Sequence, residues 1–325
     1  MDEQELLALL QRAADKRWAS LDLGYKDLTA LPPQIARLTE LRSLDLGGNP
    51  LTTLPPEIGQ LAGLESLSVM TGALEALPPE IGQLSRLRTL KLVSNHLTAL
   101  PPEIGRLGRL KTLDVAVNRL KALPPEIGNL ANLETLDLTA NHIAALPPEI
   151  GRLTRLRYLS LSGSDLSTLP PGIGHLTNLE TLDLSQNRLG QLPPEIGNLS
   201  RLRTLDLSDN ILMDLPPEIG RLASLEVLNL YANDLMTLPP EIGQLSRLRT
   251  LVVAFNQLIG LPPEIGRLAN LEELNAQENQ MHWVPRELAN LRNLKKLDLR
   301  GNRLRFSRDL LGEVDNPGAI LARLR

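Results

Sequence analysis

The sequence predicts an α/β solenoid, in which one short structural unit is repeated along the chain and each copy stacks on its neighbours. Leucine recurs every 23 residues from Leu41 to Leu294, and Trp18 extends this register backwards to give thirteen units over residues 18–305. Within one unit, residues 179–201, the part "LETLDLSQNRL" alternates apolar and polar residues as a short strand does. The remainder, "GQLPPEIGNLSR", contains two prolines that forbid a strand and can start a short helical turn.

Both ends of such an array need a cap, because the outermost repeats have no neighbour to cover their apolar side. Residues 1–17 are predicted to form an N-terminal amphipathic capping helix, since Leu and Ala recur at helical spacing over residues 2–17. A helix on a membrane surface is the alternative, but its polar face is as acidic as it is basic. Residues 306–325 are predicted to form the C-terminal cap, with an apolar set that seals the last repeat: Phe306, Leu310, Leu311, Ile320 and Leu321.

Two columns of polar residues run along the array. The ninth position of a unit is Asn in ten of thirteen units, and its amide is expected to face inward and bond backbone groups of its own and neighbouring turns. The three exceptions are Lys26, Gly72 and Ser164, and we expect Gly72→Asn to raise stability. The second column is the residue directly after each repeat leucine, from Arg42 to Lys295. Its charge usually alternates between neighbouring repeats, and the only like-charged neighbours are Arg88 and Lys111.

The composition limits which classes of partner and which cellular compartment are expected. The net charge is −4 and no basic tail is present, which argues against nucleic acid as a partner. The absence of cysteine excludes disulfide-bonded caps and thiolate metal sites, and it favours a reducing compartment. The first residues are acidic, and no run reaches the roughly 18 apolar residues that a membrane span needs. We therefore expect a cytoplasmic protein without membrane contact.

Residues for catalysis are not apparent in the pattern. Neither of the glycine-rich phosphate-binding motifs, "GxxxxGK" and "GxGxxG", occurs in the sequence. The four histidines share no metal-ligand spacing, and the repeated Glu of "PPEIG" has no paired acid or base. The sequence therefore predicts no catalytic, cofactor-binding or metal-binding residue and no enzyme activity.

The pattern "LPPEIGxLxxLxxLdLxxNxL" closely resembles leucine-rich repeat proteins over residues 18–305. The resemblance implies a curved, horseshoe-like solenoid with a concave parallel β-sheet and short helical, 3-10 or extended segments on the convex side. The 23-residue form is similar to the repeat domains of bacterial Roco-type proteins, of Ras-group-related plant proteins, and of the animal scaffold that engages Ras-family GTPases. It implies a non-catalytic scaffold that binds a partner protein on its concave face, with a small GTPase or a signalling domain as the suggested partner.

Three other interpretations remain open at this point. The run "DNPGAIL" near the end of the chain is similar to the segment that closes the array in Roco-type proteins, which favours a sensing or regulatory repeat domain of a larger signalling protein such as a Roco-type GTPase. A bacterial effector ubiquitin ligase needs a catalytic cysteine that this chain does not contain. The regularity of the repeats also suits a designed consensus solenoid.

Candidate binding residues are outward positions that differ from their equivalents in other repeats. In repeats three to five, apolar residues replace the small polar residues found at the same positions in other repeats, and Lys91 replaces a repeated Asp. Arg88 and Lys111 are expected to carry unpaired positive charge beside them. Repeats ten and eleven hold a second set of apolar residues at outward positions. We call these two sets the first and second candidate patches, and we assign Ala116 to the first and Ala254 to the second. Exposed apolar and aromatic residues with a charged rim are typical of protein interfaces. The predicted protein-binding residues are Met70, Lys91, Val93, Val117, Tyr158, Val227, Tyr231, Val252 and Phe255.

A column of outward Asp residues, such as Asp114 and Asp137, has two interpretations. It attracts a basic partner, or its carboxylates are satisfied by neighbouring hydroxyl side chains such as Thr135 and Thr181.

Overall fold

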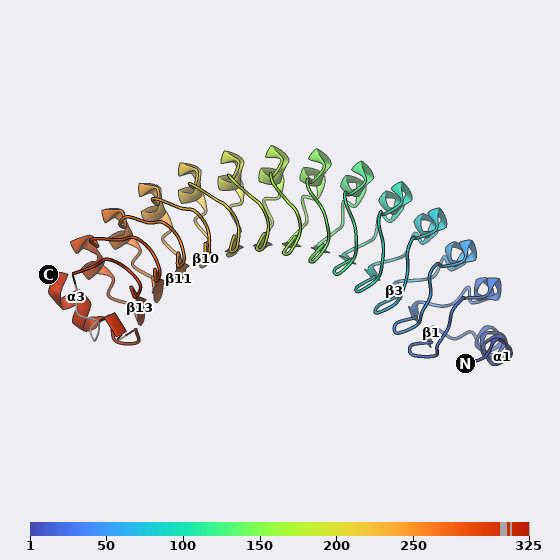
Figure 1. Cartoon of the computed structure of the whole chain (residues 1–325). Coiled ribbons are helices and arrows are strands. Elements are labelled where there is room, and N and C mark those ends of the chain that lie inside the picture. The colour runs from blue at the N-terminus through green and yellow to red at the C-terminus, as the bar shows by residue number, and fades with distance from the viewer. Residues whose placement is uncertain (306–310, 313, 325) are drawn as a thin grey trace. The chain divides into compact units, whose positions relative to one another are not determined.

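The computed structural model describes residues 1–305, 311–312 and 314–324, which form two compact units, Met1–Ser164 and Asp165–Arg325. Each unit is a solenoid of stacked repeats. Within each unit the strands lie on the concave side and the 3-10 turns lie on the convex side (Figure 1). The predicted leucine-rich repeat solenoid with 3-10 turns is therefore confirmed.

Every repeat contributes one strand of three residues, and neighbouring strands are parallel and in register. The strands follow the order of the sequence, β1 to β7 in the first unit and β8 to β13 in the second. Their bounds are β1 Ser20–Asp22, β2 Ser43–Asp45, β3 Ser66–Ser68, β4 Thr89–Lys91, β5 Thr112–Asp114, β6 Thr135–Asp137, β7 Tyr158–Ser160, β8 Thr181–Asp183, β9 Thr204–Asp206, β10 Val227–Asn229, β11 Thr250–Val252, β12 Glu273–Asn275 and β13 Lys296–Asp298.

The "PPEIG" segments form one 3-10 turn per repeat. In η5, for example, Pro124 precedes the turn in an extended conformation, Pro125 occupies its first position, and the N–H of Leu130 bonds the carbonyl of Ile127. The turns are η1 Pro33–Arg37, η2 Pro56–Gln60, η3 Pro79–Gln83, η4 Pro102–Arg106, η5 Pro125–Asn129, η6 Pro148–Arg152, η7 Pro171–His175, η8 Pro194–Asn198, η9 Pro217–Arg221, η10 Pro240–Gln244, η11 Pro263–Arg267 and η12 Arg286–Asn290.

The core of each unit is a stack of leucine and isoleucine side chains between the strands and the turns. In the repeat that begins at Leu133, the side chains of Leu136, Leu138, Ile143 and Ile150 are all fully buried. One repeat cannot remove these side chains from water alone, so the hydrophobic stabilisation comes from stacking.

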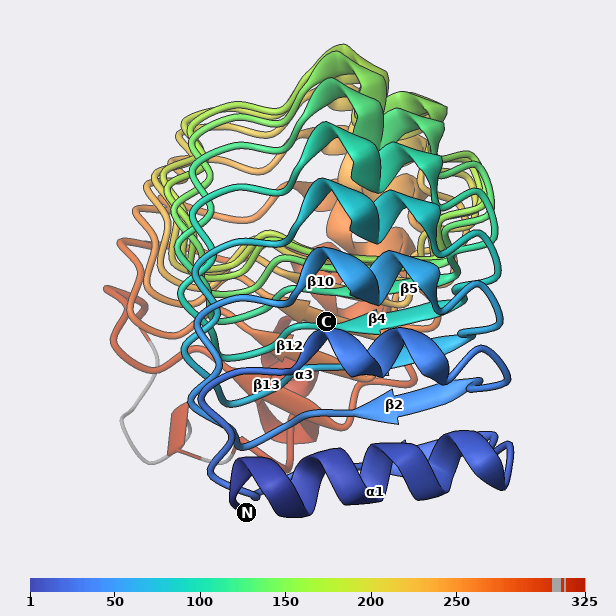
Figure 2. The ribbon, with the colours of Figure 1, turned by 90° about the vertical axis from the view of Figure 1, so that its right-hand side faces the viewer.

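Helix α1, Glu3–Asp15, covers the open end of the first repeat (Figure 2). It begins with a capping box, in which the Asp2 carboxylate accepts from the N–H of Glu5 at 2.8 Å and the Glu5 carboxylate accepts from the N–H of Asp2 at 3.1 Å. Leu6, Leu10 and Ala13 are its buried residues. The helix is shorter than the expected 2–17 because the chain turns sharply at Arg17, whose φ is 51°.

Trp18 occupies the first leucine position but is only half-buried, and the guanidinium carbon of Arg12 lies 5.7 Å from the centroid of its ring. The indole therefore shields the edge of the first repeat without filling its interior.

Helix α3, Gly318–Leu324, packs against η12 at the other end of the chain, with Ile320 and Leu321 buried. The N–H of Leu297 in β13 bonds the carbonyl of Val314 at 2.9 Å, so the chain after the last repeat returns to its final strand. Leu311 is also buried, whereas Phe306 and Leu310 of the expected cap lie outside the described residues.

The Asn column links neighbouring repeats. The Asn141 amide donates to the carbonyls of Leu138 and Thr139 in its own repeat and of Val115 in the preceding one, and its oxygen accepts from the N–H of Leu120 at 3.0 Å. Asn49, Asn95, Asn118, Asn210, Asn233, Asn256 and Asn279 repeat this pattern of bonds and are buried. The expectation that the amides bond backbone groups of their own and adjacent turns is confirmed.

Gly72 breaks this column for a steric reason. An added Cβ at Gly72 would lie 2.8 Å from the amide oxygen of Asn95 and 2.9 Å from the carbonyl oxygen of Asn49. Both oxygens belong to the inner framework, and that of Asn95 is held by the N–H of Leu74 at 3.0 Å. The expectation that Gly72→Asn would raise stability is therefore wrong, because these atoms would have to move.

Candidate protein-binding surface

The first candidate patch lies on adjacent repeats of the first unit. The N–H of Thr71 bonds the carbonyl of Val93 at 2.9 Å, so Met70 and Val93 occupy equivalent positions on neighbouring repeats, and both are half-buried. Val117 follows one repeat further on and is 48% exposed. Lys91 ends β4 beside Asp114 of β5 and is exposed. The structure therefore brings these four predicted residues together.

The basic margin expected for this patch is neutralised in part. A guanidinium nitrogen of Arg88 lies 3.7 Å from a carboxylate oxygen of Glu65, and the Lys111 ammonium lies 2.8 Å from Glu134. The expectation of unpaired charge at Arg88 and Lys111 is wrong, because each cation turns toward the acid on its other side. These pairs are exposed, so each contributes less than about 1 kcal/mol.

The outward carboxylates are held by the backbone, and two of them also accept from a neighbouring hydroxyl as the second interpretation expects. The Ser185 hydroxyl donates to Asp183 at 2.7 Å, and the Ser208 hydroxyl donates to Asp206 at 2.6 Å. The carboxylate of Asp137 accepts from the N–H of Thr139 at 2.9 Å, and those of Asp22, Asp45, Asp114, Asp183, Asp206 and Asp298 accept in the same way from the residue two positions on. This bond uses one carboxylate oxygen in each turn. The second oxygen of Asp206 accepts from the Asn229 amide at 3.0 Å, and that of Asp298 accepts from the Arg300 guanidinium at 2.6 Å.

Asp114 differs from the other acids in its electrostatics. Burial raises its pKa, the N–H of Ala116 opposes this, and the Asp137 carboxylate raises it further while Lys91 lowers it. The folded state therefore holds this proton more tightly than the unfolded chain does. Ionisation of Asp114 therefore lowers the free energy of unfolding. The loss is absent below the unfolded pKa, grows as the pH rises from there to the raised pKa, and is complete above it.

The second candidate patch is an aromatic pair in the second unit. The rings of Tyr231 and Phe255 have centroids 5.1 Å apart and planes at 56°, a tilted arrangement that favours edge-to-face contact. Phe255 is 45% exposed, and Tyr231 is half-buried. Val252 lies opposite Asn229 in the sheet, and Val227 lies two residues before Asn229 on the same strand.

Two residues counted with these patches contribute little surface. Ala254 is fully buried, and Ala116 is 8% exposed. They occupy the same repeat position as Val93 and Tyr231, but their side chains end at Cβ and so reach less far toward solvent. Tyr158 belongs to neither patch, since its strand β7 is separated from β5 by β6.

Both patches contain a bulky residue in the left-handed backbone region. The position before the column Asn has a positive φ throughout the array, and Gly48, Gly163 and Gly301 occupy it without strain. Val117 has φ 56° and Phe255 has φ 55° there, a conformation that disfavours β-branched and large side chains. Strain of this kind costs about 1–3 kcal/mol.

Val117→Gly is expected to raise the stability of the protein by about 1 kcal/mol, because glycine adopts φ near 56° without strain. Thermal unfolding measures the effect. Val93→Gly, at a neighbouring position outside the positive-φ set, is expected to lower stability. A loss of stability in Val117→Gly would show that the valine packs favourably and is not strained.

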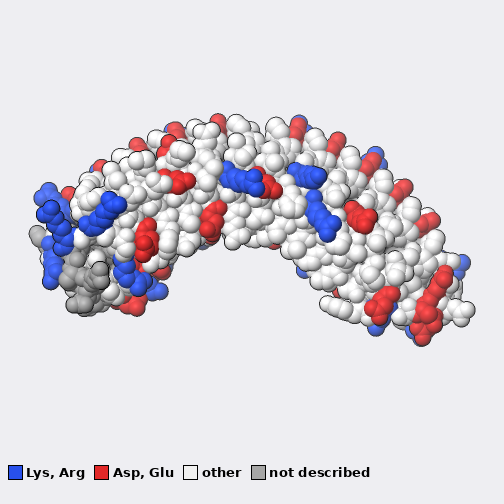
Figure 3. Space-filling model, in the orientation of Figure 1, with Lys and Arg blue, Asp and Glu red and all other residues white. Residues whose placement is uncertain are grey.

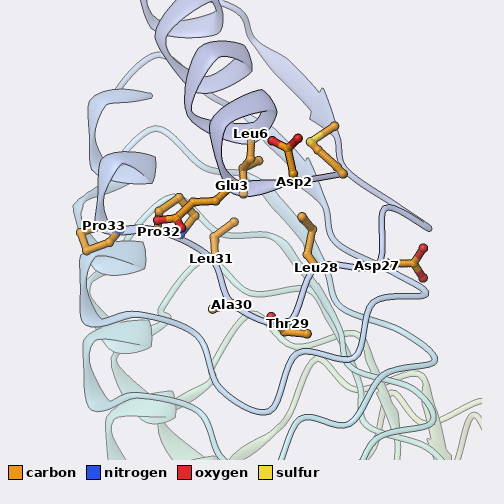
Figure 4. Close-up of a pocket in the computed structure, with 11 residues that line it drawn as sticks. Asp2, Glu3, Leu6, Asp27, Leu28, Thr29, Ala30, Leu31, Pro32 and Pro33 are labelled. Carbon is orange, nitrogen blue, oxygen red and sulfur yellow. The ribbon is translucent and has the colours of Figure 1, made fainter.

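A hollow with a volume of about 390 Å³ lies between α1 and the first repeat (Figure 4). Leu6, Leu28 and Leu31 line it together with the acids Asp2 and Glu3. The amino group of Met1 donates to the carbonyl of Lys26 at 2.7 Å and fixes the start of the chain at its rim. None of the predicted binding residues lines it, so we interpret it as the seam of the cap.

Other kinds of site find little support in the structure. On the face that Figure 3 shows, acidic and basic side chains lie in small groups separated by uncharged areas. The described residues contain no group of three or more His, Asp or Glu side chains that could hold a metal ion. Within the same residues, every helix is too short or too polar to cross a bilayer.

A third exposed apolar set lies away from the outward strand positions and is not among the predicted binding residues. Ile211, Met213, Met236, Ile259 and Trp283 lie beyond the strands, on one flank of the second unit, and each is half or more exposed. The 23-residue register could have found them, because polar residues or Ala and Gly fill most equivalent positions in earlier repeats.

Comparison with known proteins supports the repeat assignment. A family model described as a leucine-rich repeat region matches residues 77–145, 148–212 and 194–313, and a single leucine-rich repeat model matches residues 40–61. No curated protein matches the chain significantly.

Solved structures share the fold. The leucine-rich repeat protein LIC12759 of Leptospira interrogans is 34% identical, with 94% of each chain covered and a TM-score of 0.68. The plant peptide hormone receptor RGFR1, solved with RGF2, is 32% identical over 88% of this chain and 52% of its own, with a TM-score of 0.68. The Arabidopsis receptor kinase HAESA, solved with the peptide hormone IDA and the co-receptor SERK1, is 27% identical over 90% and 51%, with a TM-score of 0.70.

The chain therefore spans about half the length of the plant receptor chains and nearly all of the Leptospira protein. The matched family model covers most of the array, and the repeat length, the strands and the Asn column agree with it. This chain belongs to the leucine-rich repeat family.

Proposed function

We propose that the chain is a non-catalytic scaffold that binds a partner protein on its concave face. The observation that carries the proposal is the pair Tyr231 and Phe255, whose rings are in contact while Phe255 stands exposed on a strained backbone. Large aromatic side chains at a partly exposed surface are the residues that most often anchor protein interfaces. Similarity to receptors solved with a peptide hormone is consistent with ligand binding by such an array.

We propose that the outward Asp carboxylates orient the partner on the concave face by attracting its basic groups. Asp114 and Asp137 each use one carboxylate oxygen for the bond to the backbone, and burial makes the ionised form of Asp114 costly. A basic group of the partner placed beside Asp114 and Asp137 would offset this cost. We propose a protein ligand such as a small GTPase or another signalling domain, with basic residues facing this column.

The cysteine-free composition favours a reducing, cytoplasmic setting for this scaffold. The second candidate function is a sensing or regulatory repeat domain of a larger signalling protein such as a Roco-type GTPase. The run "DNPGAIL" favours it. Translation of the coding region beyond Arg325 distinguishes the two, since only the second requires a further domain.

Tyr231→Ala combined with Phe255→Glu is expected to lower affinity for the partner by at least about a hundredfold, because it removes the aromatic anchor and adds a charge. A photo-crosslinking residue at position 255 identifies the partner in lysate, and titration of the purified partner then gives the affinity. The matched control is Gln186→Glu, the equivalent position in another repeat, which has the same backbone conformation and is exposed.

The control is expected to bind as the unmodified chain does. The melting temperature of the double variant should change by only a few degrees, since both side chains lie at the surface. Equal affinity of the double variant and the control would exclude the second patch as the binding site.

A further inference from the structure

An exposed apolar ridge runs along one flank of the second unit. It consists of Ile211, Met213, Met236, Ile259 and Trp283, each half or more exposed. Nine large hydrophobic side chains are exposed among the described residues, and these five belong to four consecutive repeats. A contiguous apolar patch of a few hundred Å² is unusual on a monomer and often marks an interaction site.

The centre of the ridge is one column of the repeat. Met213, Met236 and Ile259 are equivalent residues 23 positions apart. The N–H of Ile259 bonds the carbonyl of Met236 at 3.3 Å, and the N–H of His282 bonds the carbonyl of Ile259 at 3.4 Å, so these residues lie side by side. The same column in earlier repeats reads Thr52, Glu75, Thr98, Lys121, Ala144, Ser167 and Gly190.

Trp283 closes the ridge and depends on a glycine in the repeat before it. A Cβ at Gly260 would lie 2.9 Å from two atoms of the indole ring, so only glycine leaves room for the ring in this position. Trp283, Ile259 and Leu261 line a shallow apolar hollow of about 180 Å³. Packing over Gly260 therefore fixes the position of the ring, and about half of Trp283 remains exposed.

Charge differs between the two ends of the ridge. Asp214 follows Met213 directly and is exposed, and Asp234 lies one repeat further, where it accepts from the Gln257 amide at 2.8 Å. At the other end, Arg303 and Arg305 are exposed in the last repeat, and Arg305 stands in the same column as Met213.

One acid departs from this trend. The Glu278 carboxyl packs over Gly301, two residues before Arg303 in the sequence. Even so, the ridge is acidic where it begins and basic where it ends.

We propose that this ridge binds the same ridge of a second copy of the chain about a two-fold axis near Ile259. A two-fold interface must be complementary to itself. With two antiparallel ridges and Ile259 facing Ile259, Met213 and Asp214 of one protomer face Arg305 of its partner. Met236 then faces His282 and Trp283. Apolar residues meet at the centre, and opposite charges meet at both ends.

The area is adequate for a dimer of moderate affinity. Five half-exposed large side chains provide on the order of 500 Å² of apolar surface, and the polar rim brings each protomer near the roughly 800 Å² of a standard interface. The two methionines, which are unbranched, can adjust their conformations to fill the contact.

Sedimentation equilibrium of the purified chain over a range of concentrations tests the proposal. The unmodified chain is expected to form dimers, and Met236→Glu is expected to remain monomeric with unchanged melting. Thr98→Glu, which places the same charge in the same column of another repeat, is the control and should dimerise normally.

Charge exchange gives a more specific test. Asp214→Arg and Arg305→Asp are each expected to weaken dimerisation by about tenfold or more, because like charges then meet at both ends. An equimolar mixture of the two variants should form a heterodimer of near-normal affinity, since every opposing pair is again of opposite charge.

A monomer at all concentrations would overturn the proposal. So would a dimer that Met236→Glu leaves intact, or variants that fail to combine when mixed. Phe255→Glu is expected to leave the dimer unchanged, so failure of the concave-face proposal and failure of this one are seen in different variants.

Discussion

Gly197→Ala is expected to destabilise the protein by about 3 kcal/mol. An added Cβ would lie 2.4 Å from the carbonyl oxygen of Glu218 and 2.9 Å from its Cβ, and the carbonyl belongs to the next 3-10 turn. Backbone cannot turn aside as a flexible side chain can, so the two turns must move apart and the leucines beneath them lose contact. Urea-induced unfolding followed by circular dichroism measures the loss.

Gly190→Ala is the matched control for this substitution. No atom lies within 4 Å of the Cβ that it would add, and alanine restricts the unfolded chain more than glycine does. Its stability is expected to stay within about 0.5 kcal/mol of the unmodified protein or to rise slightly. Equal losses in both variants would mean that close approach of the turns is not the reason for glycine at position 197.

Asn141→Ala is expected to cost about 3 kcal/mol. The amide of this buried residue donates to three carbonyls at 3.0, 2.9 and 3.3 Å, and its oxygen accepts from the N–H of Leu120. Alanine leaves these buried backbone groups without their partner, and water cannot enter to replace it. The midpoint of urea unfolding measures the effect.

Asn129→Ala tests whether the location of the amide matters. Asn129 is exposed at the end of η5, so its replacement is expected to change stability by less than about 0.5 kcal/mol. A comparable loss in Asn129→Ala, or a loss below about 1 kcal/mol in Asn141→Ala, would show that the inner column contributes little to holding the repeats together.

The 23-residue period was sufficient to predict the fold and its main polar column. A residue that recurs once per turn of a solenoid has the same environment in every repeat, so one correct interpretation of Asn141 or Ile150 applies along the array. The same register placed Tyr231 and Phe255 on neighbouring repeats, on or beside the outward strand face, and the centroid distance of 5.1 Å agrees with that placement.

Distances between neighbouring repeats could not be read from the sequence. Glycine recurs at the position of Gly197 in ten consecutive repeats, yet only the structure shows how closely the next backbone approaches its missing Cβ. At Gly72 the same kind of measurement reverses the expectation for an Asn. A period identifies equivalent residues, but it does not give the spacing between them.

Backbone conformation and solvent exposure were also decided by the tertiary structure. The positive φ at Val117 and Phe255 follows from the turn that every strand must make before its Asn. Ala254 is buried, whereas the larger Tyr231 at the same repeat position is half-buried. The sequence by itself determined which residues are equivalent and what holds the repeats together. The packing of each repeat on the next decided which of the differing residues reach the surface, because burial depends on the neighbouring backbone as well as on the side chain.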